Sequence, residues 1–404
     1  MTVAPGRGLS GGPGTSRPGP MSDAYDVVVV GARVAGSATA LHLARHGHRV
    51  AILDRAGPPT DTISTHALVR TGVLQLHRAG VLDRIVEAGT PPIREIDLFF
   101  GSEHISFPVV EECGIDAYYA PRRTVLDTAL LDASTEAGAE FYSGTSVTDV
   151  SRDENGRVDG IFIRGDRGVE RIRARHVVGA DGTQSRIARA VEARVIERSR
   201  PRNAIVYAYF EGMTATGYDF RFVDRRNVGV VPTNDGLTLV FVGGPLSQAP
   251  TDGEDYLLGT MRRVAPDIAE AIAGGTRVER LRRANGVESV LRHPAGPGWS
   301  LVGDAGFTED PISAHGMSDA LRDAELCAEA VDVALSDPAS EVEAAALYRR
   351  TRDRFAVPLM STATELAAFA WDAPEASRML RNLSDIVESE CRLLSERRPA
   401  TTAA

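Results

Sequence analysis

Residues 25–54 read YDVVVVGARVAGSATALHLARHGHRVAILD, and this stretch decides the fold. The run YDVVVV is continuously apolar and β-branched, which is typical of a parallel strand buried on both faces. A glycine-rich turn follows, then a helical segment that ends near Gly47, and then a second strand, RVAILD. Strand, turn, helix and strand in this order predict one βαβ unit of an α/β fold with a parallel sheet.

The turn GARVAG keeps two of the three glycines of the dinucleotide-binding pattern G-x-G-x-x-G. Gly31 stands at the tight turn and Gly36 where helix and strand pack closely, but Arg33 takes the middle position. We expect Arg33 to be compatible with the turn if its φ is negative and its side chain points away. Asp54 ends the second strand 23 residues after Gly31, where an acidic residue binds a ribose hydroxyl. These residues predict a nucleotide site, with the free amides of a helix beginning near Ala35 facing the phosphates.

Two later loops share a form, an apolar strand that ends in glycine and aspartate. In HVVGADGTQSRIAR the strand ends at Asp181 and Gly182, and in WSLVGDAGFTEDPISAHG it ends at Gly303 and Asp304. The second loop contains proline and leads into a predicted helix over residues 316–335. Each loop alone is a weak signal, but their order after a βαβ unit is informative.

In the order of these three motifs, from about residue 23 to 335, the chain resembles the FAD-dependent monooxygenases of the p-hydroxybenzoate hydroxylase type. Geranylgeranyl reductases resemble it in the same motifs. The resemblance implies a Rossmann-type FAD-binding domain, a β-sheet substrate domain and C-terminal helices. It also implies that non-covalent FAD contacts residues of the three motifs and of the segments RTGVL and PRRTVLD, namely Gly31, Arg33, Ala35, Gly36, Asp54, Arg55, Arg70, Arg123, Asp181, Gly182, Gly303, Asp304, Pro311, His315, Gly316 and Met317.

Within that set, the resemblance implies that different loops contact different parts of FAD. Gly31, Gly36 and Asp54 would hold the ADP half, and Asp304 would bond the ribityl chain. The loop 311–316 would place N–H groups near the flavin pyrimidine, where the helix dipole stabilises negative charge on the reduced flavin.

The late loop DPISAHG departs from the family pattern. Ala314 stands where the family usually has the first glycine of G-x-G, and this leaves His315 beside the predicted flavin ring. His315, and His66 in DTISTHAL, are candidate catalytic acid–base groups. A structural role for each histidine stays open, as does a plain surface position for Arg70 and for Arg122.

The resemblance and the secondary-structure pattern together divide the chain into segments. We expect a discontinuous FAD-binding domain, a substrate domain, C-terminal helices, and a disordered leader and tail. The FAD-binding domain comprises residues 22–92, 117–194 and 295–335, and the substrate domain comprises residues 93–116 and 195–294. The C-terminal helices span residues 336–396, the leader residues 1–21 and the tail residues 397–404.

Composition excludes several classes of function. The net charge of −10 argues against nucleic acid as a partner, and all 45 basic residues are arginine, which excludes Schiff-base chemistry on lysine. The three cysteines are far apart in the sequence, so we expect neither a dithiol motif nor a zinc site, and we expect no other bound metal. No apolar run is long enough to span a membrane. An odd cysteine count without a signal peptide favours the cytoplasm.

The electron donor and acceptor define the expected reaction. With no second G-x-G-x-x-G, the chain lacks a dedicated NAD(P) domain, so NAD(P)H is expected to bind transiently. The absence of lysine disfavours a flavin-dependent halogenase. We expect a monooxygenase that uses NAD(P)H and O2, via a flavin hydroperoxide, to hydroxylate or epoxidise a small aromatic or polyketide-like molecule of secondary metabolism. The alternatives are an FAD-dependent reductase of C=C bonds in a prenyl or polyketide-like substrate, and a non-enzymatic flavin-binding protein.

Overall fold

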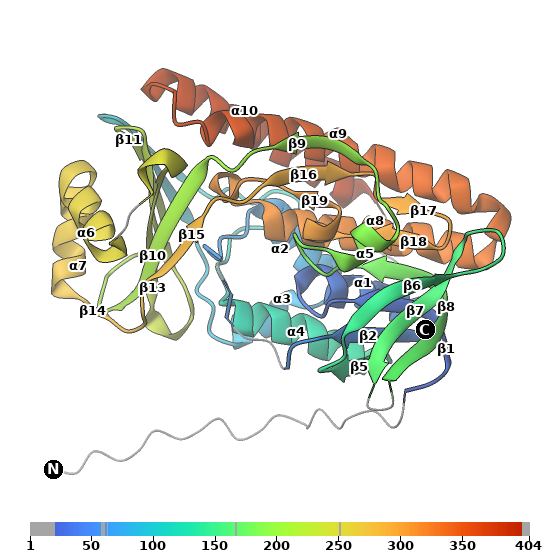
Figure 1. Ribbon diagram of the computed structural model, residues 1–404. Coiled ribbons are helices and arrows are strands. Elements are labelled where there is room, and N and C mark those ends of the chain that lie inside the picture. The colour runs from blue at the N-terminus through green and yellow to red at the C-terminus, as the bar shows by residue number, and fades with distance from the viewer. Residues whose placement is uncertain (1–20, 58–60, 63, 166–167, 250–251, 398–404) are drawn as a thin grey trace, which may run out of the picture.

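The structure is a computed structural model that describes residues 21–57, 61–62, 64–165, 168–249 and 252–397. Except for Met21 and Arg397, the predicted leader and tail lie outside these residues. The described part contains two large sheets, a small third sheet and ten α-helices (Figure 1).

The first sheet contains the βαβ unit at its centre. Its strands run in the order β17-β18-β8-β1-β2-β5, and all but β17 are parallel. Their bounds are β1 (Ala24–Val30), β2 (Val50–Asp54), β5 (Glu140–Ser143), β8 (Gly168–Gly179), β17 (Ala295–Gly296) and β18 (Trp299–Leu301). Strands β6 (Val147–Arg152) and β7 (Val158–Gly165) form a hairpin, in which β7 also pairs with the first half of β8. The predicted α/β fold is therefore confirmed.

The run YDVVVV is buried on both faces, as its composition predicts. Val27 and Val29 pack with α1 (Val34–Arg45) and α8 (Gly316–Ser336). Val28 and Val30 pack on the other side, with side chains of β6 and β7. Helix α1 ends just before Gly47, whose φ of 85° suits a helix terminus.

The second sheet is mostly antiparallel and brings distant segments together. Its order is β14-β10-β13-β12-β11-β3-β4, and β15 also pairs with β10. The bounds are β3 (Glu95–Phe100), β4 (Glu103–Pro108), β10 (Asn203–Glu211), β11 (Tyr218–Val223), β12 (Arg226–Pro232), β13 (Thr238–Pro245), β14 (Thr276–Arg277) and β15 (Arg282–Asn285). A third sheet joins β9 (Val195–Ser199), β16 (Ser289–Arg292) and β19 (Phe307–Thr308).

Strand β10 separates two environments because its side chains alternate between faces. Val206, Ala208 and Phe210 pack under α6 (Gly253–Val264) and α7 (Pro266–Gly274), which cover the outer face of this sheet (Figure 1). Tyr207 and Tyr209 point to the opposite face, where they share a cluster with Ala67 and Ala314.

Residues 65–88, whose apolar side chains recur at roughly helical spacing, contain two helices. Helix α2 (Arg70–Arg78) begins only after His66, whose φ of 63° is left-handed, and Gly80, at φ 60°, separates it from α3 (Leu82–Glu87). The remaining helices are α4 (Arg123–Glu136), α5 (Arg186–Ala190), α9 (Glu341–Leu366) and α10 (Ala373–Glu396). Short 3-10 turns lie at Asn234–Gly236, Leu246–Gln248, Gly303–Ala305, Pro311–Ser313 and Pro338–Ser340.

The described residues contain neither a candidate membrane-spanning helix nor a candidate metal cluster. None of their helices has the length and apolar character needed to cross a membrane. Nor do three or more His, Cys, Asp or Glu side chains among them gather as a metal site requires.

Candidate functional site

The three sequence motifs meet at one edge of the first sheet. Strands β1, β2, β8 and β18 are parallel neighbours, so their carboxyl ends lie side by side. The Gly31 amide donates to the Leu53 carbonyl and the Ala180 amide donates to the Val30 carbonyl, both at 2.8 Å. In open α/β sheets, ligands bind just outside such carboxyl ends, where the strand order reverses.

Two glycines in the first loop are required by the geometry. Gly31 has a φ of 111°, and a Cβ there would come within 2.3 Å of the Ala180 carbonyl oxygen. A Cβ on Gly36 would lie 1.8 Å from the carbonyl oxygen of Gly31. The loop therefore has the tight turn and the close helix–strand contact that the first and third glycines of the pattern provide.

Arg33 fits the middle position because the backbone there is ordinary. Its φ of −92° and ψ of −166° are extended, and the residue is exposed. No side chain caps the first turn of α1, whereas Asp372 caps α10 through a complete capping box.

Asp54 accepts the Ala32 amide at 2.8 Å and so fixes the shape of the loop. Arg55, which follows Asp54, is exposed.

The Gly-Asp loop packs directly on the first helix. A Cβ on Gly303 would lie 2.8 Å from the Cβ of Ala35, so the two motifs are in contact. Asp304 is exposed, yet enough protein surrounds it that desolvation raises the pKa of its carboxyl to about 6, against the opposing charge of Arg123. A carboxyl group that solvent can reach, although protein atoms largely surround it, is expected on the wall of a recess.

The proline loop turns into α8 through a strained residue. Ala314 has a φ of 58°, the left-handed conformation that glycine usually takes, at a cost of about 1–2 kcal/mol. His315 is buried, and its Nδ1 lies 2.5 Å from the Ser313 carbonyl oxygen, while its Nε2 has no partner among the described residues. Burial lowers the pKa of His315 to about 4, so the ring is neutral. Pro311 and Met317 are half-buried, and Gly316 is exposed at the start of α8.

Asp181 and Arg123 are both engaged in local contacts. Asp181 accepts the Ser185 hydroxyl at 2.5 Å and the Arg186 amide at 2.6 Å, which fixes the start of α5; Gly182 beside it has a φ of 79°. Arg123 forms a two-point ion pair with Asp127, one turn further along α4, at 3.0 Å.

Arg70 is held by a turn rather than exposed on the surface. Its guanidinium donates to the Ile115 carbonyl at 2.7 Å, and its Nε lies 3.5 Å from a Glu112 carboxylate oxygen. The guanidinium also lies over the Tyr118 ring, with its carbon 5.5 Å from the ring centroid.

His66 has a partner that the sequence does not indicate. Its Nε2 forms a very short hydrogen bond with the Tyr209 hydroxyl, and its Nδ1 has no partner among the described residues. Both residues are fully buried, and desolvation and nearby arginines lower the pKa of His66 well below its usual value. The Ser64 hydroxyl lies 3.8 Å from the Met317 sulfur, so this loop touches the start of α8.

An ion network lies beside Tyr209. The Arg122 guanidinium lies 4.4 Å from the Tyr209 ring centroid and pairs with Asp61 and Glu279. Glu279 also pairs with Arg282 at 2.9 Å. Because these positive charges already have carboxylate partners, the network offers no free charge to an anionic substrate.

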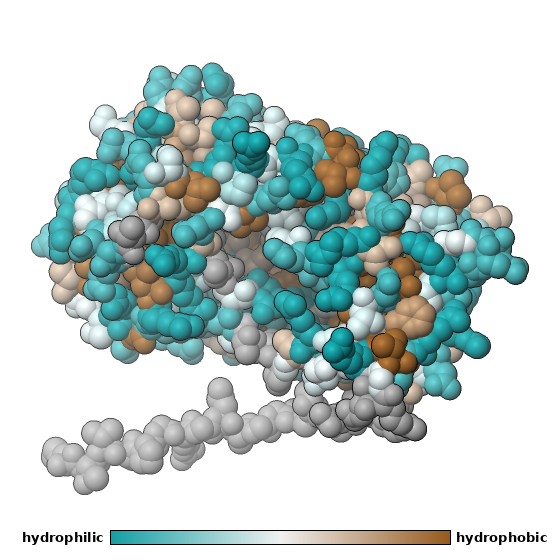
Figure 2. Space-filling view, viewed as in Figure 1, coloured by the Kyte–Doolittle hydropathy of each residue, from teal (hydrophilic) through white to brown (hydrophobic). Residues whose placement is uncertain are grey.

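The face of the second sheet toward the proline loop is apolar and aromatic. Its buried and half-buried members include Leu98, Tyr118, Phe220 and Leu237, and they share a cluster with Ala314. Figure 2 shows that the surface is hollowed near the middle of the molecule, with pale and brown residues inside the hollow.

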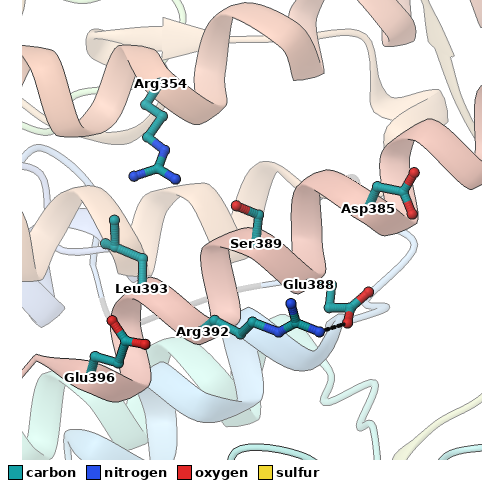
Figure 3. Close-up of a pocket in the computed structure, with 7 residues that line it drawn as sticks. All are labelled: Arg354, Asp385, Glu388, Ser389, Arg392, Leu393 and Glu396. Carbon is teal, nitrogen blue, oxygen red and sulfur yellow. Dashed lines mark hydrogen bonds and ion pairs between the residues drawn. The ribbon is translucent and has the colours of Figure 1, made fainter.

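Two surface cavities lie elsewhere. One of about 320 Å³ is lined by α9 and α10, among them Arg354 and Arg392 (Figure 3). Another of about 570 Å³ lies by α6 and α7 on the outer face of the second sheet. No motif residue lines either of them.

Comparison with known proteins indicates FAD, the cofactor expected from the sequence. A family model described as an FAD binding domain matches residues 24–363. A digeranylgeranylglycerophospholipid reductase from Methanopyrus kandleri is 30% identical over 347 residues, which cover 82% of this chain and 86% of that protein.

Solved structures share the fold at lower identity. A probable FAD-dependent monooxygenase from Pseudomonas aeruginosa has a TM-score of 0.76 and 23% identity, covering 90% of this chain and 100% of the other. A flavin-dependent brominase has a TM-score of 0.77 and 19% identity, covering 91% and 93%. These likenesses concern the fold alone. The family match spans nearly the whole described chain, so the protein belongs to the FAD-binding domain family and is an FAD-dependent oxidoreductase.

Proposed function

We propose that FAD lies along the carboxyl edge of the first sheet, held by the residues that the three motifs supply. The residues fit this group. The space beside Gly31 and Gly36 admits no side chain, and the uncapped first turn of α1 would face the pyrophosphate. Asp304 would accept a ribityl hydroxyl, and the start of α8 would face the flavin ring. The domain ranges given above then divide a cofactor-binding part from a substrate-binding part.

The substrate would lie between this edge and the aromatic face of the second sheet. That face presents aliphatic and aromatic side chains next to Ala314, and its arginines are already paired. An uncharged, extended apolar group such as a prenyl chain fits this chemistry better than an acid.

We propose that the protein reduces a C=C bond of such a substrate. When bound, reduced FAD would supply a hydride, and NAD(P)H would be the transient source of electrons. The reaction also needs a proton, and the observation that carries the proposal is the hydrogen-bonded pair of His66 and Tyr209 beside the loop that touches Met317. Neutral His66, protonated on Nε2, would donate to the Tyr209 oxygen and leave the hydroxyl hydrogen for the substrate carbon. Both side chains are buried, so a substrate would have to displace the side chains that cover Tyr209 in order to reach its hydroxyl.

The name of the Methanopyrus relative supports this choice, because it describes a reductase of a prenylated lipid. The second candidate is the monooxygenase expected from the sequence. It is favoured by the apolar face itself, since a closed apolar site protects an oxygen-transferring flavin from water.

Turnover without oxygen tests the proposal. The FAD-loaded protein is reduced anaerobically and mixed with a geranylgeranyl lipid while the visible absorbance of oxidised flavin is followed. We expect anaerobic reoxidation and a product that has gained two hydrogen atoms. Reoxidation only after O2 is admitted, with labelled oxygen in the product, would establish the monooxygenase instead.

The pH dependence of FAD binding should report on Asp304. Its pKa of about 6 means that the carboxyl is protonated below this pH, while a ribityl hydroxyl donates better to the carboxylate. Affinity should therefore rise with pH, by about tenfold between pH 5 and pH 7, as measured by flavin fluorescence titration. Asp304→Asn should bind FAD with a flat profile. Burial also raises the pKa of Asp310 to about 6, so an unchanged slope in that variant would assign the effect to Asp310.

A further inference from the structure

Two of the three cysteines lie together in the fold although they are far apart in the sequence. Cys391, on α10, is fully buried in a hydrophobic cluster, and the half-buried Cys113 packs against the same cluster. The neighbouring residues are also paired, with Arg392 Nε 3.8 Å from a Glu112 carboxylate oxygen. Figure 3 shows the adjacent side of α10, where Arg392 pairs with Glu388.

Cys113 occupies a turn position that does not suit cysteine. Glu112 and Ile115 exchange both backbone hydrogen bonds, so Cys113 and Gly114 form a two-residue hairpin turn. Both have positive φ, 55° and 78°, a geometry that favours Asn-Gly. A cysteine there opposes the local preference and places a thiol against α10.

The two thiols differ in accessibility. Burial, together with the adjacent Cys113 thiol, raises the pKa of Cys391, and Arg70 opposes the effect. Cys113 is the more exposed of the two and is reached first by a small oxidant. Cys327, in α8, is fully buried in a different cluster.

We propose that Cys113 and Cys391 are a redox modification site, which hydrogen peroxide converts into a reversible disulfide. Peroxide oxidises the Cys113 thiol to a sulfenic acid and leaves as water. The Cys391 sulfur then attacks the Cys113 sulfur, the S–S bond forms, and a second water departs. The two thiols lose two electrons and two protons, and a dithiol reductant restores them.

The link would fasten α10 to the turn that holds Arg70. That turn accepts the Arg70 guanidinium through Ile115, so oxidation would tie the C-terminal helix to a predicted cofactor contact. The proposal does not depend on the substrate or on the reaction assigned above.

Peptide mapping tests the link directly. The full-length FAD-loaded protein is reduced, desalted, treated with hydrogen peroxide, alkylated under denaturing conditions and digested with trypsin without reductant. We expect peptides 95–122 and 382–392 to appear joined, with a mass two hydrogens below their sum. The oxidised protein should melt about 3–6 °C higher than the reduced one, and a dithiol should reverse both changes.

Matched variants separate the pair from the third thiol. Cys327→Ser should keep the joined peptides, while Cys113→Ser and Cys391→Ser should each lose them and the shift in melting temperature. Oxidation of Cys113 to sulfinic acid without a joined peptide would overturn the proposal. So would a joined species that runs as a covalent dimer on a non-reducing gel.

Discussion

Gly36→Ala is expected to abolish FAD binding, with a loss of affinity of more than about 100-fold. The added Cβ would lie 1.8 Å from the Gly31 carbonyl oxygen, and this neighbour is backbone that cannot rotate away. Helix α1 must then move off the strand, which displaces the amides that we propose face the pyrophosphate. Flavin fluorescence titration and the yellow colour of the purified protein measure the loss; about 100-fold corresponds to roughly 2.7 kcal/mol.

Gly259→Ala is the matched control, because Gly259 also lies inside a helix, α6, where a Cβ would meet no heavy atom within 4 Å. This variant should bind FAD normally and gain up to about 1 kcal/mol of stability from helix propensity. If Gly36→Ala instead binds FAD as tightly as the parent protein, the first loop does not hold the pyrophosphate.

Tyr209→Phe is expected to lower kcat about 100-fold, the low end of what a general acid contributes. The hydroxyl is the only group that the substitution removes, and it is the partner of His66 Nε2. Rapid mixing should show normal reduction of FAD by NAD(P)H and slow reoxidation by the substrate. KM should change little, because the ring and its packing remain. His66→Gln should slow the same half-reaction.

Tyr218→Phe controls for the loss of a buried hydroxyl on the same sheet. Its hydroxyl donates to the Tyr119 carbonyl at 2.9 Å rather than to His66, so we expect a loss of about 1 kcal/mol in stability and an unchanged kcat. Equal reoxidation rates in Tyr209→Phe and the parent protein would remove the pair from the mechanism.

The geometry of the three loops was easier to predict from the sequence than the surroundings of the two histidines. The glycine loop, Asp54 and the Gly-Asp loop are local signals, since each combines a strand end with a residue that its turn requires. The proximity of Gly303 to Ala35 follows once both strands are placed in one parallel sheet. Tyr209 gave no such signal, because the alternation of AIVYAYF indicates that Tyr207 and Tyr209 share a face but not which face.

Contacts between distant segments also decided what several predicted residues do. Arg70 is bound by a turn more than forty residues away in the sequence, whereas Asp181 bonds only to nearby residues at the start of α5. The partner of Arg70 is not set by spacing along the chain, because it depends on how loops from different strands pack. Apolar spacing likewise does not show that the chain breaks at Gly80, whose left-handed φ separates α2 from α3.

The sequence by itself determined the βαβ unit, the nucleotide loop and the class of cofactor. Hydrophobic periodicity and the glycines that a close approach requires are properties of short segments, so they can be read without the fold. Only the tertiary structure placed Tyr209 against His66, paired Arg122 with Asp61, and brought Cys113 to Cys391. These contacts join residues dozens to hundreds of positions apart, and they exist only when the sheets and the C-terminal helix pack together.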